Sequence, residues 1–385
     1  MIQRHIAAYL LKAATEYPVV ALTGPRQSGK TTLVEHLFAN KRYVSLEDPD
    51  NRAFARQDPR AFLKQYQGGG IIDEAQYVPD LFSYIQTHVD KSKQPGEFIL
   101  TGSQNFLLLE NISQSLAGRV AIAHLLPLTY TELSGTLTQE MDIFTLLFKG
   151  LYPRMYDFSL DPTDWYKNYV TTYLERDVRQ IKQVSDLSKF QLFIRLCAGR
   201  IGQLLNMASL ATDCGIDHAT LKAWLSILEA SFLIFLLRPH HKNFNKRLVK
   251  QPKLYFCDTG LAAYLLGIER PEQLLTHYAK GALFENFVVM ELIKKRFNQG
   301  KEHQLYFWRD NHGHEIDILL SRGEELIPIE VKSSQTITSD FLKGLGYWQD
   351  LTHNQEAYLV YAGDINQRRT QATCLSWKAL SEIGY

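Results

Sequence analysis

The most specific pattern in the chain is GPRQSGKT at residues 24–31, which matches the phosphate-binding consensus GxxxxGK[ST] without a mismatch. It follows an apolar run, Val19–Thr23, that predicts a strand, and it opens a run, Thr31–Phe38, that predicts a helix. Glycines let backbone N–H groups surround phosphates, and a helix amino terminus adds positive potential. We therefore expect a nucleoside triphosphate at this loop. The residues expected to bind it are Gly24, Pro25, Arg26, Gln27, Ser28, Gly29, Lys30, Thr31 and Thr32.

Two acids at the end of a later apolar run supply the second half of the expected site. The run Gly70–Asp73 predicts a strand, and Asp73 is followed at once by Glu74. In such a site Lys30 should contact the β- and γ-phosphates, while Thr31 and Asp73 should hold Mg²⁺, the latter directly or through water. Glu74 is then expected to polarise the attacking water as a general base. The sequence thus predicts ATP and Mg²⁺ as ligands, and hydrolysis as the reaction.

A third apolar run, Phe98–Thr101, ends in polar residues that we expect near the same phosphates. Strand carboxyl ends face the ligand crevice of a parallel sheet, so Ser103 or Gln104 could sense the γ-phosphate, unless the segment is a simple turn. Arg119 could reach a phosphate within its own chain or across a subunit boundary, or be an ordinary surface arginine. Arg26, inside the loop, is a similar candidate. Action across a boundary would require a homo-oligomer.

A second group of candidate residues lies toward the carboxyl end of the chain. Asp317 in one predicted strand and Glu330-x-Lys332 in the next resemble the core of PD-(D/E)xK nucleases, and Glu285 in the helix 282–295 occupies the place of that family's accessory acid. The resemblance implies that Asp317, Glu330 and Glu285 hold Mg²⁺ and that Lys332 orients a water and stabilises charge. The alternative is a domain with a nuclease fold that only binds or holds the ATPase, in which Glu330 and Lys332 form a salt bridge.

The middle of the chain predicts a winged helix. Two helical patterns, Ile201–Thr212 and His218–Leu228, are separated by a short turn, and a strand at Phe232–Leu237 follows. The next segment, 238–253, holds six Lys or Arg and no acid, and a second strand, Lys253–Cys257, would complete the wing. These cations could neutralise phosphates of DNA. The competing interpretations are a solvated face or a protein contact, since the second helix is not basic.

Several motifs together resemble one family. They are GPRQSGKTTL, IIDEAQ, LTGSQNFLL, SLAGR, YLERDV at Tyr173–Val178 and FCDTGLAAYLL at Phe256–Leu266. The chain is similar over nearly its whole length to AAA+-like ATP-binding proteins that join an AAA-14 domain to a DUF4143 domain. This resemblance implies ATP binding and hydrolysis. Two other classes stay open: an ATP-controlled scaffold that binds partners without cleaving them, and a P-loop kinase, against which Glu74 and the large appended regions speak.

The elements that must position these residues indicate an α/β multidomain protein. We expect a P-loop, AAA+-like parallel-sheet domain at 1–126, a helical lid or linker at 127–200, a winged-helix-like region at 201–277 and a nuclease-like α/β domain at 278–385. The 385 residues are 45% hydrophobic and carry a net charge of +1, which excludes a disordered chain and a polycation. Dispersed cysteines, an amino terminus unlike a signal peptide and apolar runs too short for a membrane predict a cytoplasmic protein.

Overall fold

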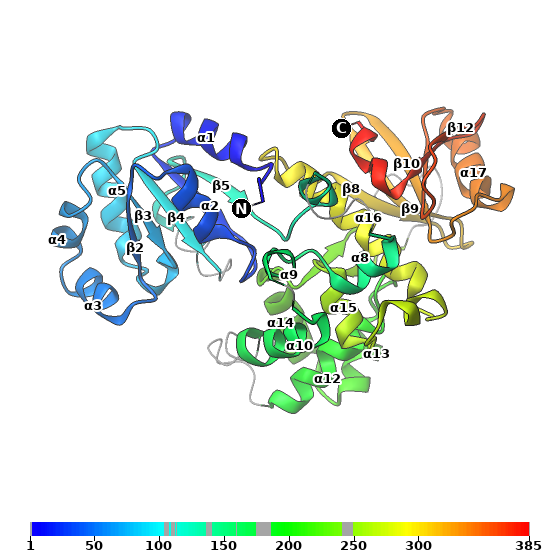
Figure 1. Ribbon diagram of the computed structural model, residues 1–385, viewed down its shortest axis with the longest axis horizontal. Coiled ribbons are helices and arrows are strands. Elements are labelled where there is room, and N and C mark those ends of the chain that lie inside the picture. The colour runs from blue at the N-terminus through cyan, green and yellow to red at the C-terminus, as the bar shows by residue number, and fades with distance from the viewer. Residues whose placement is uncertain are drawn as a thin grey trace. The chain divides into compact units, whose positions relative to one another are not determined.

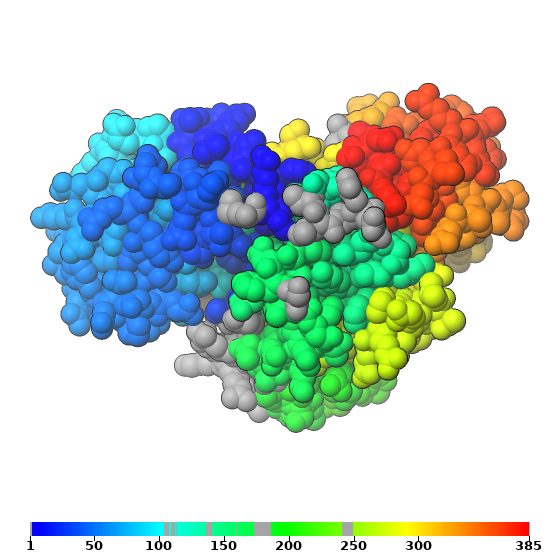
Figure 2. Space-filling model, viewed as in Figure 1, coloured from blue at the N-terminus to red at the C-terminus, as the bar shows by residue number. Residues whose placement is uncertain are grey.

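The protein is described here by a computed structural model of residues 2–103, 108, 112, 114–135, 141–158, 160–174, 186–240 and 249–384, without the side chains of 173–174 (Figure 1). The chain forms two compact units. The first contains Met1–Leu128 together with two short returning segments, Ala230–Phe232 and Arg296–Glu302. The remainder, which is drawn in green to red in Figure 2, makes up the second unit.

The first unit is built on a parallel sheet whose strand order is β2-β3-β4-β1-β5. The strands are β1 (Val19–Thr23), β2 (Arg42–Ser45), β3 (Gly70–Asp73), β4 (Phe98–Gly102) and β5 (Val120–His124). The residues of β1, β3 and β4 are all buried, as expected for parallel strands that are covered on both faces. Because β4 lies between β1 and β3, its carboxyl end adjoins both the phosphate loop and the two acids.

Helices cover both faces of this sheet because successive side chains of β1 point in opposite directions. Val19 and Ala21 pack into one core with α3, α4 and α5, whereas Val20 and Leu22 pack into another with α1 and α2. The helices are α1 (Ala7–Glu16), α2 (Lys30–Leu37), α3 (Pro49–Gln57), α4 (Pro59–Lys64) and α5 (Leu81–Ser92), and a 3₁₀ turn spans Ala75–Tyr77.

The second unit opens with helices and then forms the elements expected of a winged helix. First come α7 (Tyr130–Leu133), α8 (Ile143–Lys149), α9 (Arg154–Asp157), α10 (Pro162–Tyr169) and a π-helical turn, Val170–Leu174. Next are α12 (Leu187–Ala198), α13 (Met207–Cys214), α14 (His218–Ala230), β6 (Ile234–Leu237) and β7 (Lys253–Phe256). Strands β6 and β7 lie where the two strands of the wing were predicted, and they pair in antiparallel fashion.

One predicted helix of this region is wrong over its first half. Residues 201–206 are not helical, because Gly202 has a φ of 71° and Asn206 caps α13 by accepting a hydrogen bond from the Ser209 N–H. Instead Leu204 forms a β-bridge with Lys253. The segment therefore lies along β7 as a third extended element. Within the region 127–200, predicted as a helical lid or linker, α10 gives way to the π-helical turn, and residues 175–185 lie outside the described residues.

The rest of the second unit is a mixed sheet in the order β12-β13-β11-β10-β9-β8. Its strands are β8 (Leu305–Arg309), β9 (Glu315–Arg322), β10 (Glu325–Lys332), β11 (Tyr358–Tyr361), β12 (Gln367–Arg368) and β13 (Thr373–Ser376). Its helices are α15 (Thr259–Leu265), α16 (Lys280–Phe297) and α17 (Lys343–Thr352), with 3₁₀ turns at Pro271–Leu275, Ser339–Leu342 and Trp377–Glu382. Helix α17 packs over β9 and β10 around Trp308 and Trp348. The predicted α/β multidomain class is confirmed.

Within the described ranges, no helix combines the length and the apolar character that crossing a membrane requires.

Candidate functional site

The phosphate loop joins β1 to α2 in the way that the motif predicts. A side chain at Gly24, whose φ is 155°, would bring a Cβ to 2.1 Å from the Leu125 carbonyl oxygen, so only glycine fits there. The Lys30 Nζ donates to the carbonyls of Gly24 and Pro25, at 2.9 Å each. These contacts draw the ammonium across the loop, where phosphates are expected to bind.

Arg4 fixes the loop from outside, and nothing in the sequence pattern indicated this role. Its buried guanidinium donates to the Ser28 carbonyl at 2.8 Å and to the Leu126 carbonyl at 2.7 Å. These two carbonyls belong to the phosphate loop and to the segment after β5. A single side chain therefore joins backbone groups that are far apart in the sequence, and sequence spacing carries no signal for such a contact.

Asp73 is the centre of a cluster of hydroxyl groups. It accepts hydrogen bonds from the Thr31 Oγ1 at 3.0 Å, from the Tyr43 OH at 2.9 Å and from the Thr101 Oγ1. The strand order explains the cluster, because β2 and β4 flank β3 and carry Tyr43 and Thr101. Burial, together with the charge of Asp73, raises the pKa of Tyr43, so its hydroxyl stays a donor. Thr31 and Asp73 thus place two neighbouring oxygen groups beside the loop, of the type that Mg²⁺ prefers.

Glu74 lies beside this cluster with its carboxylate held by neighbouring side chains. The Ser103 Oγ donates to the Glu74 Oε2 at 3.0 Å, and the Gln76 side-chain amide donates to the same oxygen. This arrangement keeps the carboxylate at the carboxyl edge of the sheet. Gln104, the other candidate in this segment, lies outside the described residues.

The remaining loop candidates differ in how they are placed. Thr32 is exposed in the first turn of α2, and Gln27 has a φ of 64°. The Arg26 Nη1 lies 4.0 Å from the Glu47 Oε1, so its guanidinium pairs with an acid just beyond β2. The guanidinium of Arg26 and the ammonium of Lys30 are thus both oriented by contacts within the first unit.

Arg119 lies at the opposite edge of the sheet. Its carbonyl accepts from the Val19 N–H at the start of β1, whereas the phosphate loop follows the end of β1. Its guanidinium forms a bidentate ion pair with Asp90, with Nε–Oδ1 at 2.5 Å and Nη2–Oδ2 at 3.0 Å. The structure therefore does not bring Arg119 to the phosphate loop of its own chain. Its action on a second copy stays a prediction.

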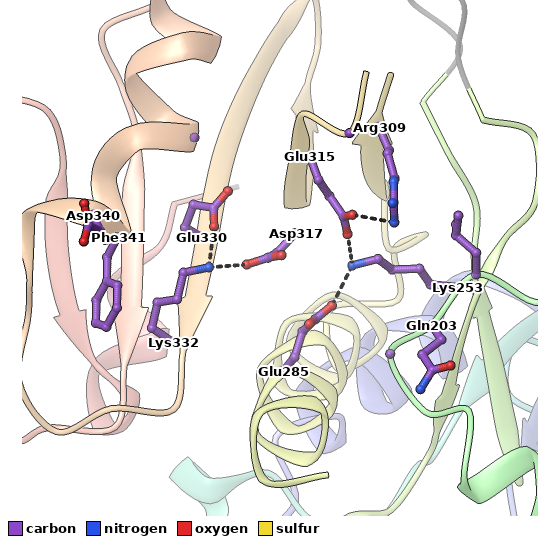
Figure 3. Close-up of a pocket in the computed structure, with 14 residues that line it drawn as sticks. Gln203, Lys253, Glu285, Arg309, Glu315, Asp317, Glu330, Lys332, Asp340 and Phe341 are labelled. Carbon is purple, nitrogen blue, oxygen red and sulfur yellow. Dashed lines mark hydrogen bonds and ion pairs between the residues drawn. The ribbon is translucent and has the colours of Figure 1, made fainter. Parts of the chain in front are cut away.

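The candidate residues of the carboxyl-terminal sheet come together around a cavity of about 680 Å³ within the second unit. Asp317 and Glu315 come from β9, Glu330 and Lys332 from β10, and Glu285 from α16 (Figure 3). The side chain of Lys332 lies between two carboxylates, at 2.7 Å from Glu330 and 3.3 Å from Asp317. Thus the structure brings together all four residues that the nuclease-like pattern singled out.

Lys253 is the member of this cluster that sequence reasoning placed elsewhere. Its ammonium lies 2.9 Å from the Glu285 Oε1 and 2.5 Å from the Glu315 Oε1 (Figure 3). Glu315 also pairs with Arg309 at 3.1 Å, and the Tyr255 OH donates to Glu285. The only sequence signal for this role is that Lys253 opens an apolar strand, where a charged side chain needs a partner when buried.

The electrostatics of the cluster reflect burial and these pairs. Burial and the neighbouring charge of Asp317 raise the pKa of Glu330 well above its usual value, and burial likewise raises that of Glu285. Burial also opposes ionisation of Asp317, but the ammonium groups of Lys332 and Lys253 outweigh it and hold its pKa below the usual range. The same carboxylates raise the pKa of both lysines, which stay charged.

In this structure, the acids of the carboxyl-terminal cluster are not arranged to hold a divalent metal ion. Across the residues that the structure describes, no group of three or more His, Cys, Asp or Glu side chains is placed to hold a metal ion. In the carboxyl-terminal cluster, ammonium groups lie between the carboxylates that the nuclease-like pattern assigns to Mg²⁺. In this structure Glu285, Asp317 and Glu330 are paired with ammonium groups, and their binding of Mg²⁺ stays a prediction.

The basic segment 238–253 is not a free wing over its described residues. The His240 N–H donates to the Phe307 carbonyl and the Val249 N–H to the Arg309 carbonyl, so both ends of the segment run along β8. Arg238 and Lys250 are exposed, but Lys253 is buried among acids and cannot contact DNA phosphates. Residues 241–248, which hold the other three cations, lie outside the described residues.

Comparisons with known proteins agree with the two halves of the resemblance. Residues 16–134 match the model of an AAA domain, described as AAA_14, and residues 280–380 match the domain of unknown function DUF4143. The region between them, 140–272, matches a further domain of unknown function, DUF8612. The expected combination of an AAA-14 domain with a DUF4143 domain is confirmed.

Relatives are found in bacteria and archaea. The uncharacterized protein Rv2008c of Mycobacterium tuberculosis is 33% identical over 337 residues, which cover 87% of this chain and 74% of the relative. The uncharacterized protein MJ1544 of Methanocaldococcus jannaschii is 23% identical, over 83% and 76% of the two chains. A solved Walker-type ATPase of Pyrococcus abyssi is 16% identical, with a TM-score of 0.47 over 69% of this chain and 96% of its own.

Proposed function

Because this chain belongs to the family of proteins that join an AAA domain to a DUF4143 domain, we propose that its first unit binds ATP with Mg²⁺ and hydrolyses it. One observation carries the proposal. The Thr31 hydroxyl of the phosphate loop lies 3.0 Å from the Asp73 carboxylate, so the two predicted magnesium ligands meet at the carboxyl edge of the sheet. Neither residue type would be needed there for packing alone.

The residues at the carboxyl edge of the sheet would have distinct roles in ATP hydrolysis. Lys30 and the loop N–H groups would bind the β- and γ-phosphates, exchanging the lysine's contacts with its own loop for contacts with the nucleotide. Mg²⁺ held by Thr31 and Asp73 would neutralise negative charge on those phosphates. Glu74, oriented by Ser103 and Gln76, would accept a proton from the attacking water.

The test is ATP hydrolysis by Lys30→Ala beside a matched control. Lys64→Ala removes an exposed lysine from α4 and should hydrolyse ATP at the wild-type rate. Lys30→Ala should release phosphate about 100-fold more slowly or worse, because it removes a positioned cation from the developing charge. A Lys30→Ala protein as active as wild type would refute the proposal. Product analysis also separates hydrolysis from phosphoryl transfer, since a kinase needs an acceptor.

We further infer that nucleic acid bound by the second unit controls this hydrolysis, and that the unit binds without cleaving. The supporting observation is the exposure of Arg238 and Lys250 at the two ends of the basic segment. Replacing both by Ala should weaken DNA binding and flatten its salt dependence, because two phosphate contacts are lost. Unchanged DNA affinity, or hydrolysis stimulated only by protein, would point to a protein partner instead.

Cleavage is measured with supercoiled and linear DNA in Mg²⁺, with and without ATP. We expect no cleavage by wild type or by Asp317→Ala while both still hydrolyse ATP. Cleavage by wild type that Asp317→Ala abolishes would restore the nuclease interpretation.

A further inference from the structure

The side chain of Lys253 is held rigidly inside the carboxyl-terminal cavity. Only 4% of this side chain is exposed, and its ammonium bridges Glu285 on α16 and Glu315 on β9 (Figure 3). Its backbone is fixed on both sides, because Lys253 pairs with Leu237 of β6 and forms the bridge with Leu204. The lysine is therefore part of a paired strand and not of a loop that could swing away.

Each of the four carboxylates around Lys253 and Lys332 contacts an ammonium group. The Lys253 ammonium forms ion pairs with Glu285 and Glu315, and the Lys332 ammonium forms ion pairs with Asp317 and Glu330. Buried carboxylates need counter-charge, because the loss of hydration is otherwise too costly. A divalent metal supplies that charge in a metal-dependent site. Here two lysine side chains supply it in the same place.

The two lysines differ in origin. Lys332 belongs to the nuclease-like pattern itself, as do Glu285, Asp317 and Glu330. All four lie within the DUF4143 match, and so does Glu315. Lys253 comes from the preceding domain, within the DUF8612 match. The cation that enters this acidic cluster is thus supplied by a neighbouring domain of the same compact unit.

We propose that Lys253 is a built-in cation that replaces the divalent metal of the nuclease-like cluster, so that the cavity is a metal-independent site that the middle domain keeps closed to Mg²⁺. This role does not depend on ATP binding by the first unit. It explains why the acids are kept together although they do not form a metal centre, and why the strand that carries Lys253 is fixed on both sides.

Removal of the ammonium should convert the cluster into a metal site. In the full chain, without nucleotide and with Asp73→Asn to silence the ATPase centre, we would measure Mn²⁺ binding by calorimetry and by the loss of the free Mn²⁺ electron paramagnetic resonance signal. Lys253→Met keeps the length of the side chain and removes its charge. It should bind Mn²⁺ at least about tenfold more tightly than the parent, because a positive charge close to the carboxylates is gone. Lys222→Met, an exposed change on α14 of the same unit, should bind like the parent.

Two further measurements make the outcome decisive. Adding Asp317→Asn to Lys253→Met should abolish the gained binding, which places the metal in this cluster. A folded Lys253→Met protein without gained Mn²⁺ binding would overturn the proposal. So would a parent chain that already binds Mn²⁺ in a way that Asp317→Asn removes, and this result stands even if Lys253→Met fails to fold. Since no ATP is present, failure here is distinct from failure of the proposed hydrolysis.

Discussion

Glu74 is the residue at which nucleotide binding and hydrolysis should separate. Its carboxylate contacts Ser103 and Gln76 but no residue of the phosphate loop among its described hydrogen bonds. Glu74→Gln keeps the shape and removes the base, so the rate of phosphate release should fall by about 10²- to 10⁴-fold. Binding of a fluorescent ATP analogue should change little. The control is Glu35→Gln, an exposed change on α2, and a large loss of binding in Glu74→Gln would contradict the assigned role.

His124 should make the stability of the first unit depend on pH. Its ring is buried against Phe232 and Phe297, its Nδ1 has no hydrogen-bond partner, and burial lowers the pKa to about 4. The unfolded chain, with a pKa near 6.5, therefore binds the proton more tightly. The stabilisation from a neutral His124 is complete above about pH 6.5 and is lost as the pH falls toward 4, by about 3 kcal/mol in all.

The variant His124→Phe tests this linkage, since it keeps an aromatic ring and removes the titration. As the pH is lowered from 7 to 4, the melting temperature should fall more steeply for wild type than for His124→Phe. Parallel curves for the two proteins would show that His124 does not titrate between the folded and unfolded states in this range.

At the scale of elements, the Asp258 carboxylate joins α15, α10 and the segment just after α8. It caps α15 through the Leu261 N–H at 3.0 Å, and it also accepts from the Leu151 N–H at 2.7 Å and from the Tyr166 OH at 2.6 Å. Asp258 belongs to the motif FCDTG, part of the family resemblance, and its described contacts are structural. Asp258→Ala should cost about 3 kcal/mol, because buried donors on three segments lose their acceptor.

Asp217 provides the matched control for that change. It is exposed at the start of α14 and accepts a hydrogen bond from the Thr220 N–H at 2.9 Å. Asp217→Ala should cost only about 1 kcal/mol, the usual value of an exposed helix cap. Urea denaturation of the second unit measures both, and equal losses for the two variants would mean that the additional contacts of Asp258 contribute nothing.

Local patterns were sufficient for some elements and failed for others. The strand, loop and helix around Lys30 could be predicted because all their signals lie within a few residues of one another. The helix expected from Ile201 failed because its apolar spacing also suits an extended segment, and only Gly202 and Asn206 hinted at a later start. The site residue Thr101 could be placed at a strand end, but its contact with Asp73 depends on strand order, which no local pattern fixes.

Long-range contacts account for most of what the sequence could not predict about the sites. Lys253 was assigned to DNA contact because it ends a basic run, and its burial follows from pairing with β6 and from acids on β9 and α16. Arg4 carried no signal at all, since its carbonyl partners lie 24 and 122 residues away. For Lys253 the sequence indicated a cation that binds anionic groups but not which groups, whereas for Arg4 it indicated neither.

At the scale of the whole molecule, the AAA domain is completed by segments from the later chain. Ala230–Phe232 and Arg296–Glu302 belong to the first compact unit, where the rings of Phe232 and Phe297 contact His124 at 5.5 and 5.1 Å. The backbone of Gly300 approaches the Tyr9 ring so closely that a Cβ there would lie 2.1 Å from it. The second unit is thus joined covalently to the first through four chain crossings beyond the one at 128–129, namely at 229–230, 232–233, 295–296 and 302–303.

A fragment that ends with the AAA match should therefore be less stable than the same unit in the full chain. Residues 1–134 lack Phe232 and Phe297, and the fragment exposes apolar surface around His124. Scanning calorimetry should show a melting temperature at least about 5 °C lower for the fragment. The transition of the unit in the full chain is identified by its upward shift with a non-hydrolysable ATP analogue. Equal melting temperatures would show that the returning segments do not stabilise the first unit. If full-length Phe297→Ala lowers the melting temperature as much as truncation does, the stabilisation comes from the contact with His124.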